Sequence, residues 1–257
     1  MFKHCSTFNQ PIGCWDVSKV VDMTGMFSEA HSFNQPLQKW EVKQVTKMEG
    51  MVRGSSCCCC CCCCTVVHPC GVAARRHKLI LFFCFNKPPQ FHQARSFNQP
   101  LANFNTASVT TFESMFEGAQ AFNQPLDHFD LAACTTLNKM FEQATSFNQP
   151  LATWKTDNVR KMNFVFKDAT SFNQPLETWS MGNCVRTAGM FEGAKAFNQT
   201  LSAWDIAKVD NMESMFKNAT AFNQPLRKDW NVKHVSYGTD DMFEGSGVAP
   251  AKRCLIM

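Results

Sequence analysis

The tripeptide Phe-Asn-Gln occurs eight times in this 257-residue chain, and its spacing limits the folds that the chain can adopt. Six of the seven intervals between copies are 25 residues, and the remaining interval is 64. The repeated Phe residues are Phe8, Phe33, Phe97, Phe122, Phe147, Phe172, Phe197 and Phe222. A fixed period of this length predicts a repeat solenoid, in which each repeat forms one coil and stacked coils share a core.

We number each repeat from its Phe, which is position 0. Position 4 is Leu or Ile in all eight copies, position 7 is aromatic and position 12 is Val or Cys in seven, and position 15 is mostly apolar; Trp230 fits position 7 of the eighth copy after a one-residue slip. Positions 18 and 19 read Met-Phe in five copies, and position 22 is Ala in six. One repeat cannot bury these side chains alone, so we expect a core that runs continuously through the stacked coils.

The Asn and the Gln of the tripeptide do not vary among the eight copies. Identical amides in stacked strands can hydrogen-bond along the stacking axis, so these side chains are predicted to be structural. Pro follows in seven copies and Thr200 in the eighth. Because Pro lacks a backbone donor, this point is predicted to be a corner or the end of a strand.

Positions 15 to 22, for example residues 212–219, have apolar residues at helical spacing. The segment is too short for an independent helix, so one or two docked helical turns are expected. Short parallel strands are expected either near Phe-Asn-Gln or near position 12.

Residues 52–90 carry none of the repeat positions. They contain eight consecutive cysteines, Cys57–Cys64, and a seven-residue apolar run at 79–85. A metal or redox loop would need defined ligand spacing and supporting contacts. A membrane anchor would need about 20 apolar residues. Besides a metal or redox loop and a membrane anchor, a third interpretation of this segment is non-coding sequence, which would be disordered if translated.

Deleting Val52 to Gln90 joins Met51 to Phe91 and restores the repeat, because these 39 residues are the whole excess in the 64-residue interval. Val codons begin with GT and one Gln codon is CAG, which match the ends of an intron. We therefore hypothesise a retained intron in a eukaryotic gene, and sequencing of the transcript tests it.

The same segment distorts the bulk composition. It holds five basic residues and no acidic ones, so the other 20 bases and 21 acids leave a formal charge of −1 rather than the +4 of the whole chain. This balance gives no indication of a nucleic-acid-binding surface. Ten of the 15 cysteines also lie there. Of the other five, Cys134 and Cys184 occupy position 12 two coils apart, about 10 Å at strand spacing, which is too far for a disulfide.

The unit Phe-Asn-Gln-Pro-Leu-x-x-Trp, followed by Val at position 12, Met-Phe at 18 and 19 and Ala at 22, resembles the 25-residue repeat of BspA-like, mycoplasma-type surface proteins. That family is a distant relative of the leucine-rich repeats. The resemblance implies a leucine-rich-repeat-like solenoid at the cell surface or outside the cell, with a role in adhesion or protein binding. It brings no catalytic residues.

These observations predict a repeat solenoid over residues 1–51 and 91–247, the non-repeat segment 52–90 between them, and a tail at 248–257. Met1 aligns with position 18 of an incomplete repeat, so we expect the chain to be a fragment with its true start upstream. The chain has neither a run of 18 apolar residues nor a signal peptide at Met1.

The chain ends in Cys254-Leu-Ile-Met, which fits the prenylation pattern. Lipidation of Cys254 would place the protein on the cytoplasmic face of a membrane, whereas a chance match would mean nothing. Replacing Cys254 with Ser and measuring membrane fractionation distinguishes the two.

The sequence predicts no catalytic, cofactor-binding or metal-binding residue, because the seven His are scattered and no phosphate loop or nucleophile motif occurs. A non-enzymatic solenoid that binds a protein or cell-surface ligand is expected. A prenylated scaffold and a purely structural array stay open as alternatives. No aromatic or Arg cluster is expected at exposed positions to identify a binding face.

Overall fold

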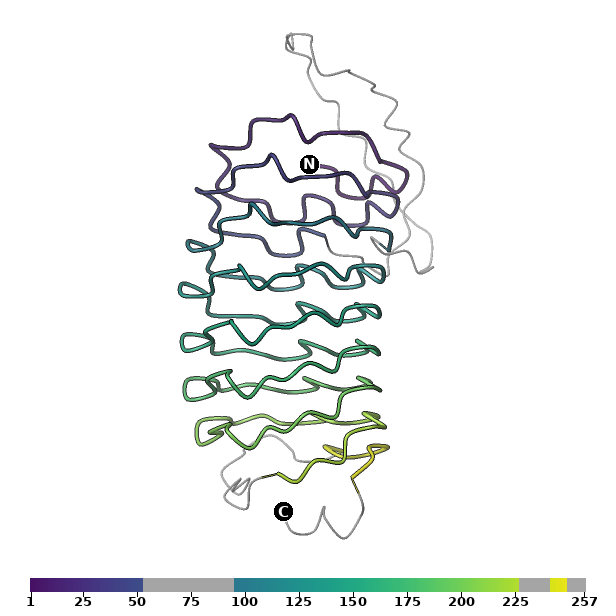
Figure 1. The fold of residues 1–257 in the computed structure, drawn as a ribbon, viewed down its shortest axis with the longest axis vertical. Helices are drawn as coiled ribbons and strands as arrows, with labels where there is room; N and C mark the ends of the chain where they lie inside the picture. The colour runs from purple at the N-terminus through teal and green to yellow at the C-terminus, as the bar shows by residue number, and fades with distance from the viewer. Residues whose placement is uncertain (53–94, 227–240, 249–257) are drawn as a thin grey trace, which may run out of the picture.

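The computed structural model describes residues 1–52, 95–226 and 241–248, which form coils stacked along one axis (Figure 1). These residues contain no helix and no strand longer than an isolated bridge. Among the coils from the one that begins at Phe8 to the one that begins at Phe197, position 14 forms a parallel bridge with position 14 of the next coil, close to one of the two places where the sequence predicts strands. The bridged residues are Asp22, Lys47, Thr111, Thr136, Lys161, Arg186 and Asn211.

Positions 15 to 22 form consecutive turns where the sequence predicts helical turns. Positions 17 and 21 have positive φ, between 53° and 72°. A left-handed residue at every fourth position prevents an α-helix from continuing. The helix-like apolar spacing comes instead from short turns: the N–H of Met140 donates to Leu137 O, and that of Ala144 to Phe141 O, both at 3.0 Å.

Alternate backbone N–H groups of this turn segment donate to the next coil. In the coil that begins at Phe122, the N···O distances of these bonds are 2.7–2.9 Å. The donors are Leu137, Lys139, Phe141 and Gln143, and the acceptors are the carbonyls of Lys161, Asn163, Val165 and Lys167. Each coil therefore depends on its neighbour to satisfy its backbone.

Two columns of Phe rings fill the core along the axis. The ring at position 0 lies 5.7–6.1 Å from the same ring in the next coil, and the ring at position 19 lies 5.6–5.9 Å from its own copy. The two columns touch, since Phe116 stacks on Phe122 and Phe141 on Phe147 with centroids 4.0 Å apart. The two columns are part of one continuous apolar core, as the repeat positions predict.

The coils on either side of the non-repeat segment stack directly on each other. Lys47 bridges Thr111, Phe33 stacks on Phe97 at 6.1 Å, and the N–H of Asn98 donates to Asn34 Oδ1 at 3.0 Å. The residues of each pair are 64 positions apart in the sequence, yet they make the contacts that residues 25 positions apart make between other coils. The register of the stack thus continues across the junction.

Val52 occupies position 19 in the coil that begins at Phe33. Its N–H donates to Met115 O at 3.0 Å, and its side chain is buried. The same position holds Phe27 in the coil before and Phe116 in the coil after. The column of rings is therefore interrupted at Val52, which lies where the sequence analysis would place Phe91 if residues 52–90 were removed.

We predict that deleting residues 52–90 raises the free energy of unfolding, because Phe91 then supplies the missing ring. Aromatic pairs contribute about 0.5–1.5 kcal/mol each beyond the area that they bury. Deleting 53–91 is the matched control, since it removes as many residues but keeps Val52 at position 19. Urea unfolding should give the first deletion an advantage of about 1–3 kcal/mol over the control. Equal stability of the two deletions would contradict this account of the column.

Gly189 provides a second test of the turn geometry, because it has φ of 56° and lies under the ring of Phe164. A Cβ at Gly189 would lie 2.4 Å from that ring, whereas one at Gly182 would meet nothing within 4 Å. We expect Gly189→Ala to cost about 1–3 kcal/mol and Gly182→Ala less than about 0.5 kcal/mol in urea unfolding. In a Phe164→Ala background the cost at Gly189 should fall, and an unchanged cost there would refute the steric explanation.

Candidate interaction surface

The Asn of each tripeptide forms a polar column along the axis, which confirms the predicted amide ladder. Asn123 Oδ1 accepts the backbone N–H of Asn148 at 2.9 Å and Nε2 of Gln149 at 3.1 Å. The same pair of bonds occurs at each coil from Asn9 to Asn198. The column shows why neither residue varies: shortening Asn would remove two hydrogen bonds at once.

The Trp column is also anchored from coil to coil. Its indole Nε1 donates to the position-4 carbonyl of the preceding coil at 2.8–3.1 Å. The donors are Trp40, Trp154, Trp179 and Trp204. A buried indole normally needs such an acceptor.

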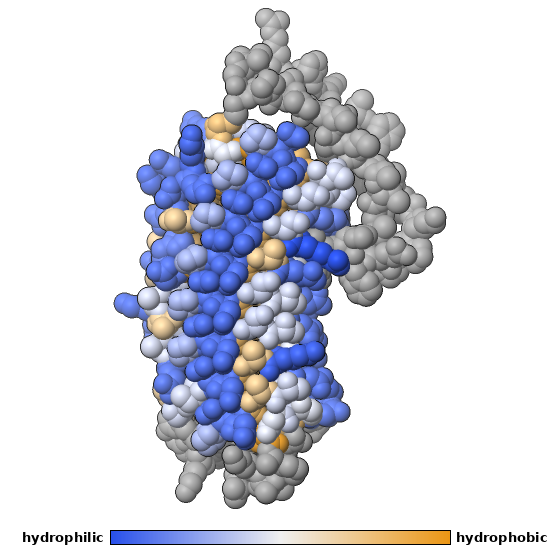
Figure 2. Space-filling model, turned by 45° about the vertical axis from the view of Figure 1, so that its right-hand side comes forward, coloured by the Kyte–Doolittle hydropathy of each residue, from blue (hydrophilic) through white to orange (hydrophobic). Residues whose placement is uncertain are grey.

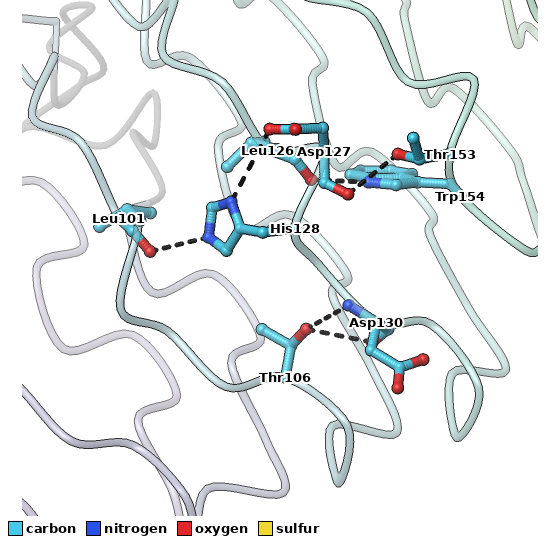
Figure 3. A network of polar contacts seen from close by, with 8 residues as sticks. All are labelled: Leu101, Thr106, Leu126, Asp127, His128, Asp130, Thr153 and Trp154. Carbon is cyan, nitrogen blue, oxygen red and sulfur yellow. Dashed lines mark hydrogen bonds and ion pairs between the residues drawn. The ribbon is translucent and has the colours of Figure 1, made fainter.

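His128 takes over this bond in the coil where the column holds Phe129 (Figure 3). Its Nε2 lies 2.9 Å from Leu101 O, which requires the proton on Nε2, and its Nδ1 lies 4.0 Å from Asp127 Oδ1. In the sequence, His128 is one of seven scattered histidines with no predicted role. The adjacent Phe in a Trp column was the available clue, because a ring without an N–H leaves a carbonyl for another donor.

Beside it, Thr106 and Asp130 connect adjacent coils through one hydroxyl (Figure 3). Thr106 Oγ1 donates to Asp130 O at 3.1 Å and accepts the N–H of Asp130 at 2.8 Å. The hydroxyl of Thr106 and the backbone N–H and C=O of Asp130 find their hydrogen-bond partners within the protein, so this contact is structural.

The side chains at positions 17, 20 and 21 form what we call the turn face, where charges of opposite sign pair. Lys167 Nζ lies 3.0 Å from Glu192, and Lys217 Nζ lies 3.0 Å from Asp241 and 2.5 Å from Glu244. Hydrogen bonds to Glu244 and Asp241 raise the pKa of Lys217, whereas burial raises the pKa of Glu142. Each of the three lysines on this face is therefore paired with at least one carboxylate.

The side chains at positions 13 and 14 form what we call the bridge face. In its N-terminal half, the hydroxyls of Thr46, Thr110 and Thr135 donate to the preceding coil. Similar side chains thus follow one another along the axis, and Figure 2 shows stripes of similar hydropathy along the molecule.

Three cations gather at the C-terminal half of the bridge face. Lys161 and Arg186 are bridge partners, and Arg160 precedes Lys161 at the exposed position 13. Within the described part of the chain, none of the three forms an ion pair. Exposed positions were expected to carry no Arg cluster, but Arg160 and Arg186 lie next to Lys161 on this face. The 25-residue period was the missed clue, since it places residue 186 beside residue 161.

An open groove lies beside the first two coils, lined by Gly13, Trp15, Lys39 and Glu41 among others. Three or more His, Cys, Asp or Glu side chains in metal-binding geometry do not occur in the described ranges. The described part of the chain also has no helix of the length and hydropathy needed to cross a membrane.

Cys254 and the poly-Cys run lie outside the described residues. So do His68, His77, His92 and His234.

Cys134 and Cys184 are free, fully buried thiols, as their place in the Val column predicts. Burial raises the pKa of each thiol to about 12, from an ordinary value of 9.0. Because the folded-state pKa is raised, these thiols favour folding below pH 9, and that contribution is lost as the pH rises toward 12. At neutral pH both are almost entirely protonated and unreactive.

We predict that these two thiols react only when the chain unfolds. The 52–90 deletion with Cys5, Cys14 and Cys254 replaced by Ser leaves only Cys134 and Cys184. At pH 8, a disulfide reagent should label neither thiol in the native protein and both in concentrated guanidinium chloride. Native labelling as fast as denatured labelling would contradict the burial.

The family model described as "Mycoplasma protein of unknown function, DUF285" matches residues 1–58, 88–179 and 148–251. Comparisons with curated proteins and with solved structures give no match. The three matched ranges cover most of the sequence and overlap at 148–179, as expected for tandem copies of one unit. On this evidence the chain belongs to this mycoplasma-type repeat family, whose function is unknown.

Proposed function

We propose that this protein is a non-enzymatic, BspA-like and leucine-rich-repeat-like solenoid that binds a protein at a cell surface. The 25-residue period, the parallel bridges at position 14 and the turns that follow them support this fold. Stacked repeats offer long surfaces whose outward positions vary while the core is kept.

The observation that carries the proposal is the group of cations on the bridge face. Lys161 and Arg186 are like charges on bridged residues, an arrangement that destabilises a sheet. Arg160 adds a third charge, and all three lack a carboxylate partner within the described residues. The repulsion among these cations is explained by a binding partner that supplies the opposite charge. We propose that this partner is an acidic protein surface.

The rest of the molecule favours this face over the turn face. Lys139, Lys167 and Lys217 on the turn face are already paired with Glu or Asp, so an acidic partner would have to displace intramolecular contacts. The bridge face requires no such exchange. Arg is also the residue best suited to bidentate contacts with carboxylates.

We predict that reversing the three charges abolishes binding. Fluorescently labelled chain should bind saturably to cultured animal cells in flow cytometry, and trypsin treatment of the cells should remove the binding. The variant Arg160→Glu, Lys161→Glu, Arg186→Glu should bind at least about tenfold more weakly, since each lost charge pair at an interface costs on the order of 1 kcal/mol or more.

The matched control reverses three exposed lysines elsewhere, with Lys39→Glu, Lys155→Glu and Lys195→Glu, so that the net charge changes equally. It should bind as the unmodified chain does. No saturable binding, binding that resists trypsin, or equal loss in both variants would refute the proposed function.

A further inference from the structure

Two Asn residues lie in the pattern Asn-x-Thr that N-linked glycosylation requires, and both are in the coil that begins at Phe197. One is Asn198, followed two residues later by Thr200, which stands where the other copies have Pro. The other is Asn218, followed by Ala219 and Thr220. Their surroundings differ, and the structure separates a usable acceptor from a structural one.

Asn198 belongs to the amide column. Its Oδ1 accepts the backbone N–H of Asn223 at 3.0 Å and Nε2 of Gln224 at 3.1 Å. Its own N–H donates to Asn173 Oδ1 at 2.9 Å. A sugar on this side chain would have to share a column in which amides follow at the spacing of stacked strands, about 4.8 Å.

Asn218 is exposed and sits at position 21 of the turn face, with φ of 58°. The same position holds Gly193 in the coil before and Gly245 in the coil after, so no side chain flanks it in its column. Its Oδ1 leans over Gly245, 2.3 Å from where a Cβ would be. Among the described residues no hydrogen bond holds its Nδ2.

We propose that Asn218 is an N-glycosylation site, which rests on the proposed location at the cell surface. The donor is an oligosaccharide linked to a polyprenyl diphosphate. Nδ2 of Asn218 forms a bond to the anomeric carbon of the first sugar and gives its proton to a base. The bond from that carbon to phosphate breaks, and the polyprenyl diphosphate leaves with the electron pair.

The glycan would project from the turn face, next to the ion pairs of Lys217. It would cover lysines that are already paired with carboxylates.

The test is translation of the full chain, with a secretion signal added in front, in the presence of microsomes, followed by endoglycosidase digestion and electrophoresis. We expect a glycosidase-sensitive mobility shift that Asn218→Gln and Thr220→Ala each reduce by one glycan. Gln143 occupies the equivalent position with φ of 59°, so Gln at 218 is compatible with the turn. Thr200→Pro removes the other pattern, restores the residue of the other copies, and should leave the Asn218 glycan in place.

A shift that Asn218→Gln leaves undiminished, or no glycosidase-sensitive shift, would overturn the assignment. Because the added signal delivers the chain to the lumen, such a result would refute only the modification site. The cell-binding experiment is to be done with chain produced without glycans, so the proposed function fails or stands independently.

Discussion

The hydrogen bonds between adjacent coils are the interaction on which the rest of this structure depends. A helix satisfies its own backbone, but these turns do not, because left-handed residues at positions 17 and 21 direct alternate N–H groups out of the coil. An unpaired buried backbone group costs about 1–3 kcal/mol, and each coil presents several. A single coil is therefore unstable in isolation, and stability arises from the contacts between neighbours.

A residue in one of these columns can be replaced when the hydrogen-bonding groups of the neighbouring coil keep their partners. Phe129 removes an indole donor from the Trp column, and His128 restores a donor to the carbonyl left by the missing bond. Cys134 replaces Val without a polar penalty, since its Sγ lies 3.3 Å from Thr136 O. Val52 breaks only the ring column, because its backbone still donates to the next coil. A substitution in a column is thus constrained by its polar partners more than by its shape.

The sequence was sufficient for the apolar core positions and for the invariant amides of the tripeptide. The burial of the Phe columns and the bonding of the Asn column follow from invariant residues at a fixed interval. The turn segment was harder to predict, because successive turns and a helix both place apolar residues at i, i+3, i+4 and i+7. Gly25 and Gly118, at positions 17 and 21, indicated left-handed backbone, but other coils carry Lys139 and Gln143 there with the same φ. Only the surrounding stack explains why those side chains accept this conformation.

The outward positions are less predictable because their meaning comes from the neighbouring coil. Arg160 and Arg186 are unremarkable in sequence, and they become a cluster only when the 25-residue period brings them together. The core columns fix the register so tightly that it survives 39 extra residues between two coils. A rigid register makes the bridge face a surface on which single substitutions change charge without moving the backbone. Partner choice in such a protein can therefore change at a few exposed positions while the stacking contacts stay the same.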